Sequence, residues 1–195
     1  ARKQLKLPED KQIILFVSQK VTDPRKGMDY LIESLNRLLA DNPSLRERAV
    51  VAILGGQAEE IAERLPMEAY PLGYVSETKR IVAIYSAVDL FVTPSLSDNL
   101  PNTIMEAMAC GVPCVGFKVG GIPEMIDHLK NGYVANYCDT ADFANGIRWV
   151  LAEADWNELS AACLRKVHTC YSLTSVSLRY TELYSQALAS KNYKI

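Results

Sequence analysis

The sequence predicts an α/β protein with a Rossmann-like, doubly wound and mostly parallel sheet, helices on both faces and a helical C-terminus. Two observations predict this fold. Short β-rich runs alternate with segments in which apolar residues recur at helical spacing, and glycine or proline stands at the junctions. Strands separated by helices imply right-handed crossovers, and therefore parallel neighbours. With 195 residues the chain suits one generous domain.

The first strand, helix and second strand show this alternation. Ile13 to Ser18 is an apolar run typical of a buried strand, and Met28 to Leu39 has its leucines at helical spacing. Ala49 to Leu54 is strand-like again. Because ligands of such sheets bind at the carboxyl ends of the strands, the loop 19–27 is expected on the ligand side.

The same alternation continues along the chain, which ends in helices. Further strands are expected near Tyr70 to Leu72, Leu90 to Thr93 and Val112 to Phe117. Helices between them are expected near Ala58 to Leu65, Ser76 to Ala87 and 102–110. Three more helices are expected at Ala141 to Ala154, Trp156 to Thr169 and Thr174 to Ala189. The pattern singles out no strand after Phe117.

Composition and charge exclude several classes of protein. The net charge is −2 and no run of like charges stands out, which disfavours a nucleic acid or a membrane surface as an electrostatic partner. The five cysteines form no Cys-x-x-Cys pair, and no signal peptide or bilayer-length apolar run is visible, so a reduced, cytoplasmic domain is expected. No Gly-x-Gly-x-x-Gly follows the first strand, which argues against a dinucleotide-dependent oxidoreductase.

The polar loop and helix between Ser95 and Glu106 carry the strongest functional signal. Asn102 is a good N-cap candidate, although Pro101 can instead be the first helical residue behind a cap at Asn99. Either choice leaves free N–H groups around 102–104, and these suit a diphosphate together with the helix dipole.

Glu106 shares a helical face with Asn102 and Thr103 and is expected to point back toward such an anion. There its carboxylate can accept hydrogen bonds from a ribose diol. An ordinary capped helix with a solvated glutamate would show the same spacing.

Two further loops follow strands on the same expected side of the sheet. Arg25 and Lys26 stand next to a helix start, where cations oppose the helix dipole, and this arrangement hints at a bound anion. Tyr74 and Val75 follow the third strand, where the tyrosine or its backbone can meet a base. Solvated surface turns are the alternative for both loops.

Six motifs in order resemble the donor-binding half of the glycosyltransferase group 1 family, which are retaining enzymes of the GT-B type. They are Lys-Gly after the first strand, Leu-Gly-Tyr-Val-Ser at 72–76, Ala-Val-Asp-Leu-Phe-Val-Thr-Pro-Ser at 87–95, Asp98 and Glu106 around Pro-Asn-Thr, Met-Glu-Ala-Met-Ala-Cys-Gly-Val-Pro at 105–113, and Gly-Gly-Ile-Pro-Glu at 120–124. The series is far more specific than any one member, and it covers nearly the whole chain.

The resemblance implies a role for each paired acidic position of the Glu-x7-Glu type. Asp98 replaces the first glutamate and would face the transferred sugar, while Glu106 would hold the ribose. Asn99 to Asn102 replaces the usual Gly-Phe-Gly run, which leaves the sugar contact open.

The phosphate and base contacts also follow from the resemblance. Lys26 matches the phosphate lysine, and the N–H groups of Asn102 and Thr103 would bind the distal phosphate. Tyr74 and Val75 fall where the base is bound. Ser18-Gln19 stands in place of the usual Gly-Arg pair, so Arg25 or Lys20 would supply the second cation.

By the same resemblance the expected activity is transfer of a glycosyl group, with retention, from a UDP-, GDP- or ADP-sugar to a glycan or lipid-linked acceptor. Because members of the family commonly act in cell-surface polysaccharide or lipopolysaccharide biosynthesis, the resemblance implies such a role. Asp98, Lys26 and Glu106 are the expected catalytic set, and no cofactor or metal is required, because Lys26 and the helix-end amides can stabilise the leaving diphosphate. A non-catalytic nucleotide-sugar-binding module and a GT-B-type epimerase remain alternatives.

The resemblance also implies a division of the chain. Residues 1–10 are expected to be a remnant of an interdomain connector, 11–170 a Rossmann-like nucleotide-sugar-binding domain, and 171–195 a C-terminal helix that packs toward a missing N-terminal acceptor-binding domain. The polypeptide alone is then expected to be inactive. Peripheral membrane association would come only through the missing domain, and no nucleic-acid partner is expected.

Overall fold

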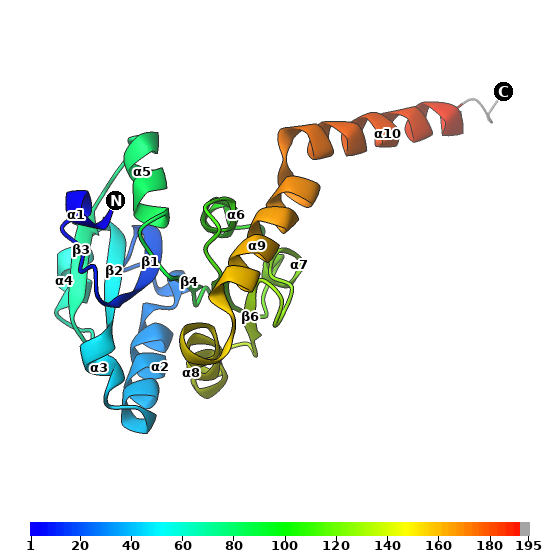
Figure 1. Ribbon diagram of the computed structural model, residues 1–195. Helices are drawn as coiled ribbons and strands as arrows, with labels where there is room; N and C mark the ends of the chain where they lie inside the picture. Colours follow the sequence, from blue (N-terminus) through cyan, green and yellow to red (C-terminus); the bar gives the residue numbers. More distant parts are fainter. Residues whose placement is uncertain (192–195) are drawn as a thin grey trace.

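A computed structural model of the chain describes residues 1–191, and its centre is one sheet of parallel strands in the order β3-β2-β1-β4-β5-β6 (Figure 1). The strands are β1 (Gln12–Lys20), β2 (Ala49–Gly56), β3 (Ala69–Gly73), β4 (Leu90–Thr93), β5 (Cys114–Phe117) and β6 (Gly132–Ala135). Every neighbouring pair is parallel. The predicted Rossmann-like, doubly wound α/β fold is confirmed.

The side chains of each central strand alternate between two hydrophobic cores, one on each face of the sheet. In β1, Ile14 and Phe16 belong to one core, whereas Ile13 and Leu15 belong to the other. All four are essentially inaccessible to solvent. A strand that is buried on both faces has an uninterrupted apolar sequence, which is why this run predicts a strand so clearly.

Helices cover both faces of the sheet and supply the other half of each core. Those on the first face are α2 (Met28–Asp41), α3 (Leu45–Arg48), α4 (Ala58–Ala62) and α8 (Thr140–Arg148). Those on the second face are α1 (Arg2–Leu5), α5 (Thr78–Tyr85), α6 (Asn102–Ala109), α7 (Ile122–Met125) and α9 (Trp156–Lys166). The predicted helices on both faces are therefore confirmed.

Two late helices change their winding; α9 starts at the predicted residue, Trp156, and α8 starts at Thr140, one residue before the predicted start. Asp139 and Asp155 cap α8 and α9 by accepting backbone N–H bonds from the first turns. Each helix then widens into a π-type segment, η2 (Trp149–Glu153) and η3 (Val167–Tyr171). A backbone bond between residues five apart, from Ala154 N to Trp149 O, closes η2.

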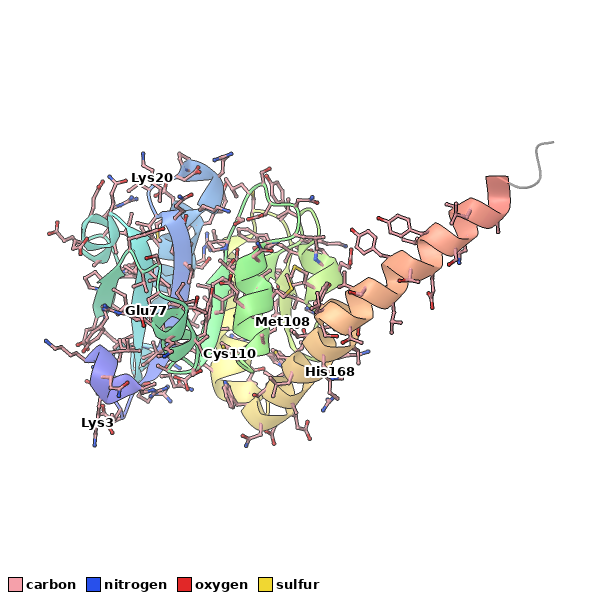
Figure 2. All side chains as sticks on the ribbon, turned by 90° about the horizontal axis from the view of Figure 1, so that it is seen from above. Lys3, Lys20, Glu77, Met108, Cys110 and His168 are labelled. Carbon is pink, nitrogen blue, oxygen red and sulfur yellow. The ribbon has the colours of Figure 1, made fainter. Side chains whose placement is uncertain are left out.

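The last helix, α10 (Leu173–Lys191), leaves the body of the molecule (Figures 1 and 2). Its apolar residues are largely exposed, including Leu173 at 85%, Tyr184 at 64% and Leu188 at 67%. This helix therefore presents an exposed apolar surface. Residues 192–195 of the predicted C-terminal helix lie outside the described residues.

The N-terminal segment lies against the domain. The Arg2 guanidinium donates to the Ala87 carbonyl and pairs with Asp89, each at 2.8 Å, and Leu7 is buried in the second core. Within residues 1–191, no helix is both long enough and apolar enough to cross a membrane.

Candidate functional site

Successive strands are added outward in one direction from β1 to β3 and in the opposite direction from β4 to β6, so the strand order reverses between β1 and β4. Two adjoining cavities lie at the carboxyl ends of these two strands. The larger cavity, about 310 Å³, is lined by Lys20, Arg25, Lys26, Asp98 and Thr103 among others. The smaller one, about 90 Å³, is lined by Tyr74, Val75, Tyr85 and Glu106 among others. Residues 17–19 at the end of β1 line both cavities. Such a reversal point is where doubly wound sheets bind ligands.

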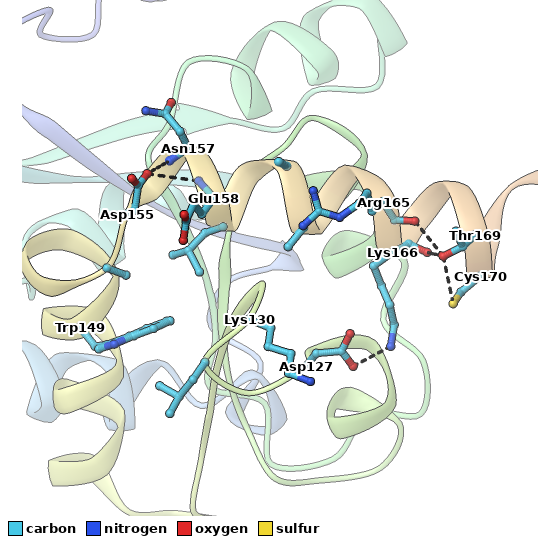
Figure 3. Close-up of a pocket in the computed structure, with 15 residues that line it drawn as sticks. Asp127, Lys130, Trp149, Asp155, Asn157, Glu158, Arg165, Lys166, Thr169 and Cys170 are labelled. Carbon is cyan, nitrogen blue, oxygen red and sulfur yellow. Dashed lines mark hydrogen bonds and ion pairs between the residues drawn. The ribbon is translucent and has the colours of Figure 1, made fainter.

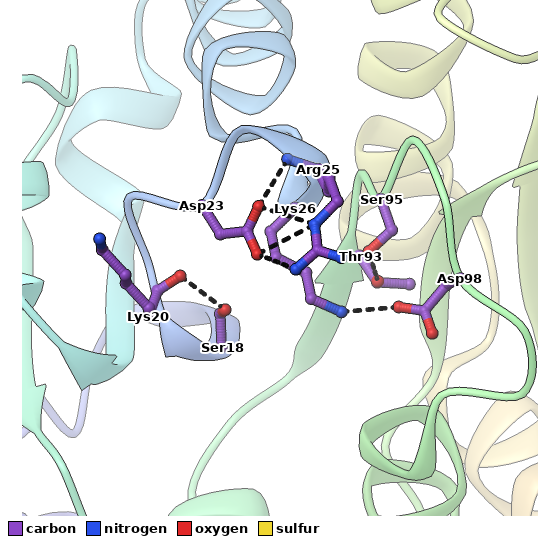
Figure 4. Close-up of polar contacts among 8 residues, drawn as sticks. All are labelled: Ser18, Lys20, Asp23, Arg25, Lys26, Thr93, Ser95 and Asp98. Carbon is purple, nitrogen blue, oxygen red and sulfur yellow. Dashed lines mark hydrogen bonds and ion pairs between the residues drawn. The ribbon is translucent and has the colours of Figure 1, made fainter.

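Lys26 and Asp98 form an ion pair in the larger cavity. Lys26 Nζ lies 2.8 Å from Asp98 Oδ2, and the two side chains are 32% and 16% exposed (Figure 4). Lys26 ends the short 3-10 helix η1 (Pro24–Lys26) after β1, and Asp98 lies in the loop after β4. The fold therefore brings a cation and a carboxylate predicted for the site into direct contact.

Gly27 allows the loop after β1 to approach the loop after β4. Its φ is +71°, and a Cβ there would lie 1.8 Å from the Pro94 carbonyl oxygen. Leu96 N also donates to the Arg25 carbonyl at 2.8 Å. A residue without a side chain is thus required where the backbone turns to present Lys26.

Arg25 lies beside Lys26, but its guanidinium pairs with Asp23 at 2.7 Å (Figure 4). The side-chain bond from Arg25, followed by the bond from its backbone N–H, lowers the pKa of Asp23 to about 2. Arg25 is 76% exposed, whereas Lys20 forms no ion pair within the described residues. Both candidates for a second cation line the larger cavity.

The N-terminus of α6 opens onto the larger cavity. Asn102 is the first helical residue and Pro101 the N-cap, so both expected caps, Asn102 and Asn99, were wrong. Proline lacks a capping side chain, and no side-chain cap bond forms. The N–H groups of Asn102 and Thr103 accordingly have no hydrogen-bond acceptor in the described part of the chain.

The Gly120-Gly121 turn supports the loop that carries Asp98. Gly120 has a φ of +52°, and a Cβ there would lie 1.7 Å from the Asp98 carbonyl oxygen. Gly121 N donates to the Asn99 carbonyl. This motif therefore packs against the backbone of the site.

Glu106 and Tyr85 meet in the smaller cavity, between α6 and α5. The Tyr85 hydroxyl donates to Glu106 Oε2 at 3.0 Å, and Tyr85 is 1% exposed. Tyr74, at the rim of the same cavity, is 66% exposed. The sequence does not single out Tyr85, because an aromatic residue at helical spacing among apolar neighbours indicates core packing. The available signal is its hydroxyl, since a buried tyrosine O–H usually has a hydrogen-bond partner.

A larger groove of about 1070 Å³ lies along α9 and shares none of the predicted site residues (Figure 3). Lys166 pairs there with Asp127 at 2.8 Å, and Asp155 is engaged as the cap of α9. Volume alone therefore does not mark the candidate site. No cluster of three His, Cys, Asp or Glu side chains able to hold a metal occurs among residues 1–191.

Comparisons with known proteins identify the family. The family model described as Glycosyl transferases group 1 matches residues 11–153. The chain is 32% identical over 171 residues to a D-inositol 3-phosphate glycosyltransferase of Thermobifida fusca, covering 82% of this chain and 39% of that protein. It is 33% identical over 166 residues to the enzyme of the same name from Geodermatophilus obscurus, covering 80% and 36%.

Solved structures share the fold. Sucrose-phosphate synthase from Thermosynechococcus elongatus superposes with a TM-score of 0.74 at 26% identity, covering 97% of this chain and 48% of that one. HepE of Anabaena, in complex with UDP and glucose, superposes at 0.75 with 22% identity, covering 95% and 51%. This chain thus spans between 36% and 51% of the proteins in both kinds of comparison. It belongs to the glycosyl transferases group 1 family.

Proposed function

We propose that this chain is the donor-binding part of a retaining glycosyltransferase that uses a nucleoside-diphosphate sugar. The observation that carries the proposal is the pair of adjoining cavities at the reversal point of the sheet. One is lined by lysine and arginine and faces helix-end amides that have no acceptor within residues 1–191. The other holds a carboxylate that accepts a hydrogen bond from a tyrosine. A diphosphate suits the first cavity and a ribose with its base suits the second.

In the proposed mechanism the larger cavity stabilises the leaving diphosphate. Negative charge develops on the phosphates as the glycosidic bond breaks. Lys26, released from its ion pair with Asp98, would stabilise that charge together with the N–H groups of Asn102 and Thr103. The acceptor would attack from the face that the diphosphate leaves, and the phosphate would take the proton of the acceptor. Asp98 would accept hydrogen bonds from the transferred sugar rather than act as a nucleophile.

The partners of the reaction are part of the same proposal. The chain spans 36–39% of the curated relatives above, so an acceptor-binding domain outside this sequence would complete the enzyme. Support for a nucleotide sugar comes from HepE, whose solved structure contains UDP and glucose. A glycan or lipid-linked acceptor, a cytoplasmic location and independence from metal ions are proposed with it.

Isothermal titration calorimetry tests the proposal. We expect the chain to bind one of UDP, GDP and ADP in the presence of EDTA, and Lys26→Ala and Glu106→Gln each to weaken that binding about tenfold or more. Lys130→Ala, on the remote groove, is the matched control and should leave binding unchanged. A folded chain that binds none of the three nucleotides, or binds only when a divalent cation is added, would contradict the proposal.

A further inference from the structure

Tyr85, which is buried, and Glu106, which is exposed, form a hydrogen-bonded pair whose members come from different helices. Tyr85 is the last residue of α5, and Glu106 lies in the middle of α6. The phenol donates to Glu106 Oε2 at 3.0 Å, and both residues line the smaller cavity. The contact therefore lies at the wall of the cavity, where a tyrosine of the second core meets an exposed carboxylate.

The tyrosine is held rigidly and stays protonated. Its ring packs edge-on against Phe91, with centroids 6.1 Å apart and an interplanar angle of 72°. Burial, and then the Glu106 charge and the hydrogen bond itself, raise the pKa of Tyr85. A neutral phenol in a fixed position is a permanent donor toward one side of the carboxylate.

Within the described residues, no lysine, arginine or histidine pairs with Glu106, so the Tyr85 hydroxyl is its side-chain partner. A carboxylate has about four acceptor positions, and Tyr85 occupies one of them on Oε2. The other oxygen stays available to a ligand in the cavity. A cis-diol, which offers two O–H donors on neighbouring carbons, matches that remaining capacity.

We infer that Tyr85 is a positioning residue that orients Glu106 toward the ribose hydroxyls of the bound nucleotide. The inference rests on the proposed function. It adds that the preference of this site for a ribonucleotide depends on a residue that does not touch the nucleotide. Without the phenol, the carboxylate can rotate, and its contacts with the diol weaken.

A tyrosine that only packs would behave differently from one that positions Glu106. Phenylalanine keeps the ring and its contact with Phe91, so pure packing predicts little change on Tyr85→Phe. Positioning predicts a loss that requires both the ribose hydroxyls and the Glu106 carboxylate. The two roles therefore separate when the nucleotide and the glutamate are varied together.

The experiment compares UDP with 2′,3′-dideoxy-UDP, or the corresponding pair for GDP or ADP, by calorimetry on the full chain. We expect Tyr85→Phe to weaken binding of the ribonucleotide roughly threefold to tenfold and binding of the dideoxy analogue less than twofold. In the Glu106→Gln background the same substitution should have little further effect. Tyr133→Phe removes a similar tyrosine–carboxylate bond, from Tyr133 to Asp142 at 2.7 Å, away from both cavities, and is the matched control.

Several outcomes would overturn the inference. The inference fails if Tyr85→Phe leaves ribonucleotide binding unchanged, or if it weakens the binding of both nucleotides equally. It also fails if Tyr85→Phe weakens ribonucleotide binding as much in the Glu106→Gln variant as in the wild type. Thermal melts of each variant show whether a loss of binding reflects unfolding. If Tyr85→Phe unfolds the chain, binding of the ribonucleotide and of the dideoxy analogue is compared on Glu106→Gln instead. If the folded wild-type chain binds neither nucleotide, the proposed function itself fails.

Discussion

Lys26 Nζ lies 2.8 Å from Asp98 Oδ2, although the two residues are 72 positions apart and follow different strands of the sheet. A diphosphate bound in the larger cavity would compete with Asp98 for this lysine. The Asp98 carboxylate would therefore lie next to the bound phosphate and compete with it for the Lys26 ammonium.

We predict that Asp98→Asn tightens binding of the free nucleoside diphosphate roughly threefold to tenfold. The change keeps the shape of the side chain and removes a negative charge that pairs with Lys26 and repels phosphate. The gain should shrink for the nucleotide sugar, because the variant loses an acceptor for sugar hydroxyls. Calorimetry with both ligands measures the two effects, and weaker binding of the free diphosphate would contradict the prediction.

The second cation of the site is predicted to be Lys20. Asp23 already neutralises Arg25 through an ion pair of 2.7 Å, whereas Lys20 lines the same cavity and forms no ion pair within residues 1–191. We expect Lys20→Ala to weaken diphosphate binding severalfold and Arg25→Ala less than twofold. Titrations at two salt concentrations give the measurement, and the reverse order of the two variants would assign the role to Arg25.

Gly27→Ala is predicted to damage both stability and binding. A Cβ at Gly27 would lie 1.8 Å from the Pro94 carbonyl oxygen, so the loop bearing Lys26 must move. Gly73 is a matched control, because its φ of +66° is similar but no atom lies within 4 Å of the added Cβ. Urea melts should show a loss of about 1–2 kcal/mol for Gly73→Ala, from backbone strain alone, and a larger loss for Gly27→Ala. Equal losses would refute the clash.

The sequence could predict the elements that carry strong periodicity. The buried runs of β1 and β2 and the amphipathic spacing of α2 are dictated by burial on a sheet with two covered faces. The strand β6 was missed because Tyr133 and Val134 in its middle are half-buried, whereas the equally short β4 and β5 are buried throughout. So short and mixed a segment has neither an apolar run nor a clear alternation.

The candidate site was predictable as a set of residues but not as a set of contacts. Lys26, Asp98, Thr103 and Glu106 all line the two cavities, as expected for residues that follow parallel strands. The pairing of Lys26 with Asp98 depends on how two loops lean together, which spacing does not encode. The bond from Tyr85 to Glu106 joins two helices, and such contacts follow from tertiary packing alone.

Alkaline pH is predicted to destabilise the fold through its buried thiols. Burial raises the pKa of Cys163 to about 12, and Cys163 Sγ donates to the Asn131 carbonyl at 3.2 Å. A thiol in the unfolded chain ionises near about 8.5. The folded chain therefore holds its proton where the unfolded chain has lost it. This contribution to stability is fully present below that value and is lost as pH rises toward 12.

Cys163→Ala tests this pH dependence through the slope of stability against pH. Between about pH 9 and 11 the variant should lose stability more slowly than the wild type, by up to roughly 1.4 kcal/mol per pH unit. Part of the slope remains in both proteins, because the pKa of buried Cys114 is also raised. Above about pH 10, Tyr85 and Tyr133, whose pKa values are raised too, contribute to the slope in the same way. Cys170→Ala, at a partly exposed position, is the control and should leave the slope unchanged. Urea melts at several pH values give the slopes, and identical slopes for the wild type and Cys163→Ala would show that the Cys163 proton makes no difference to stability.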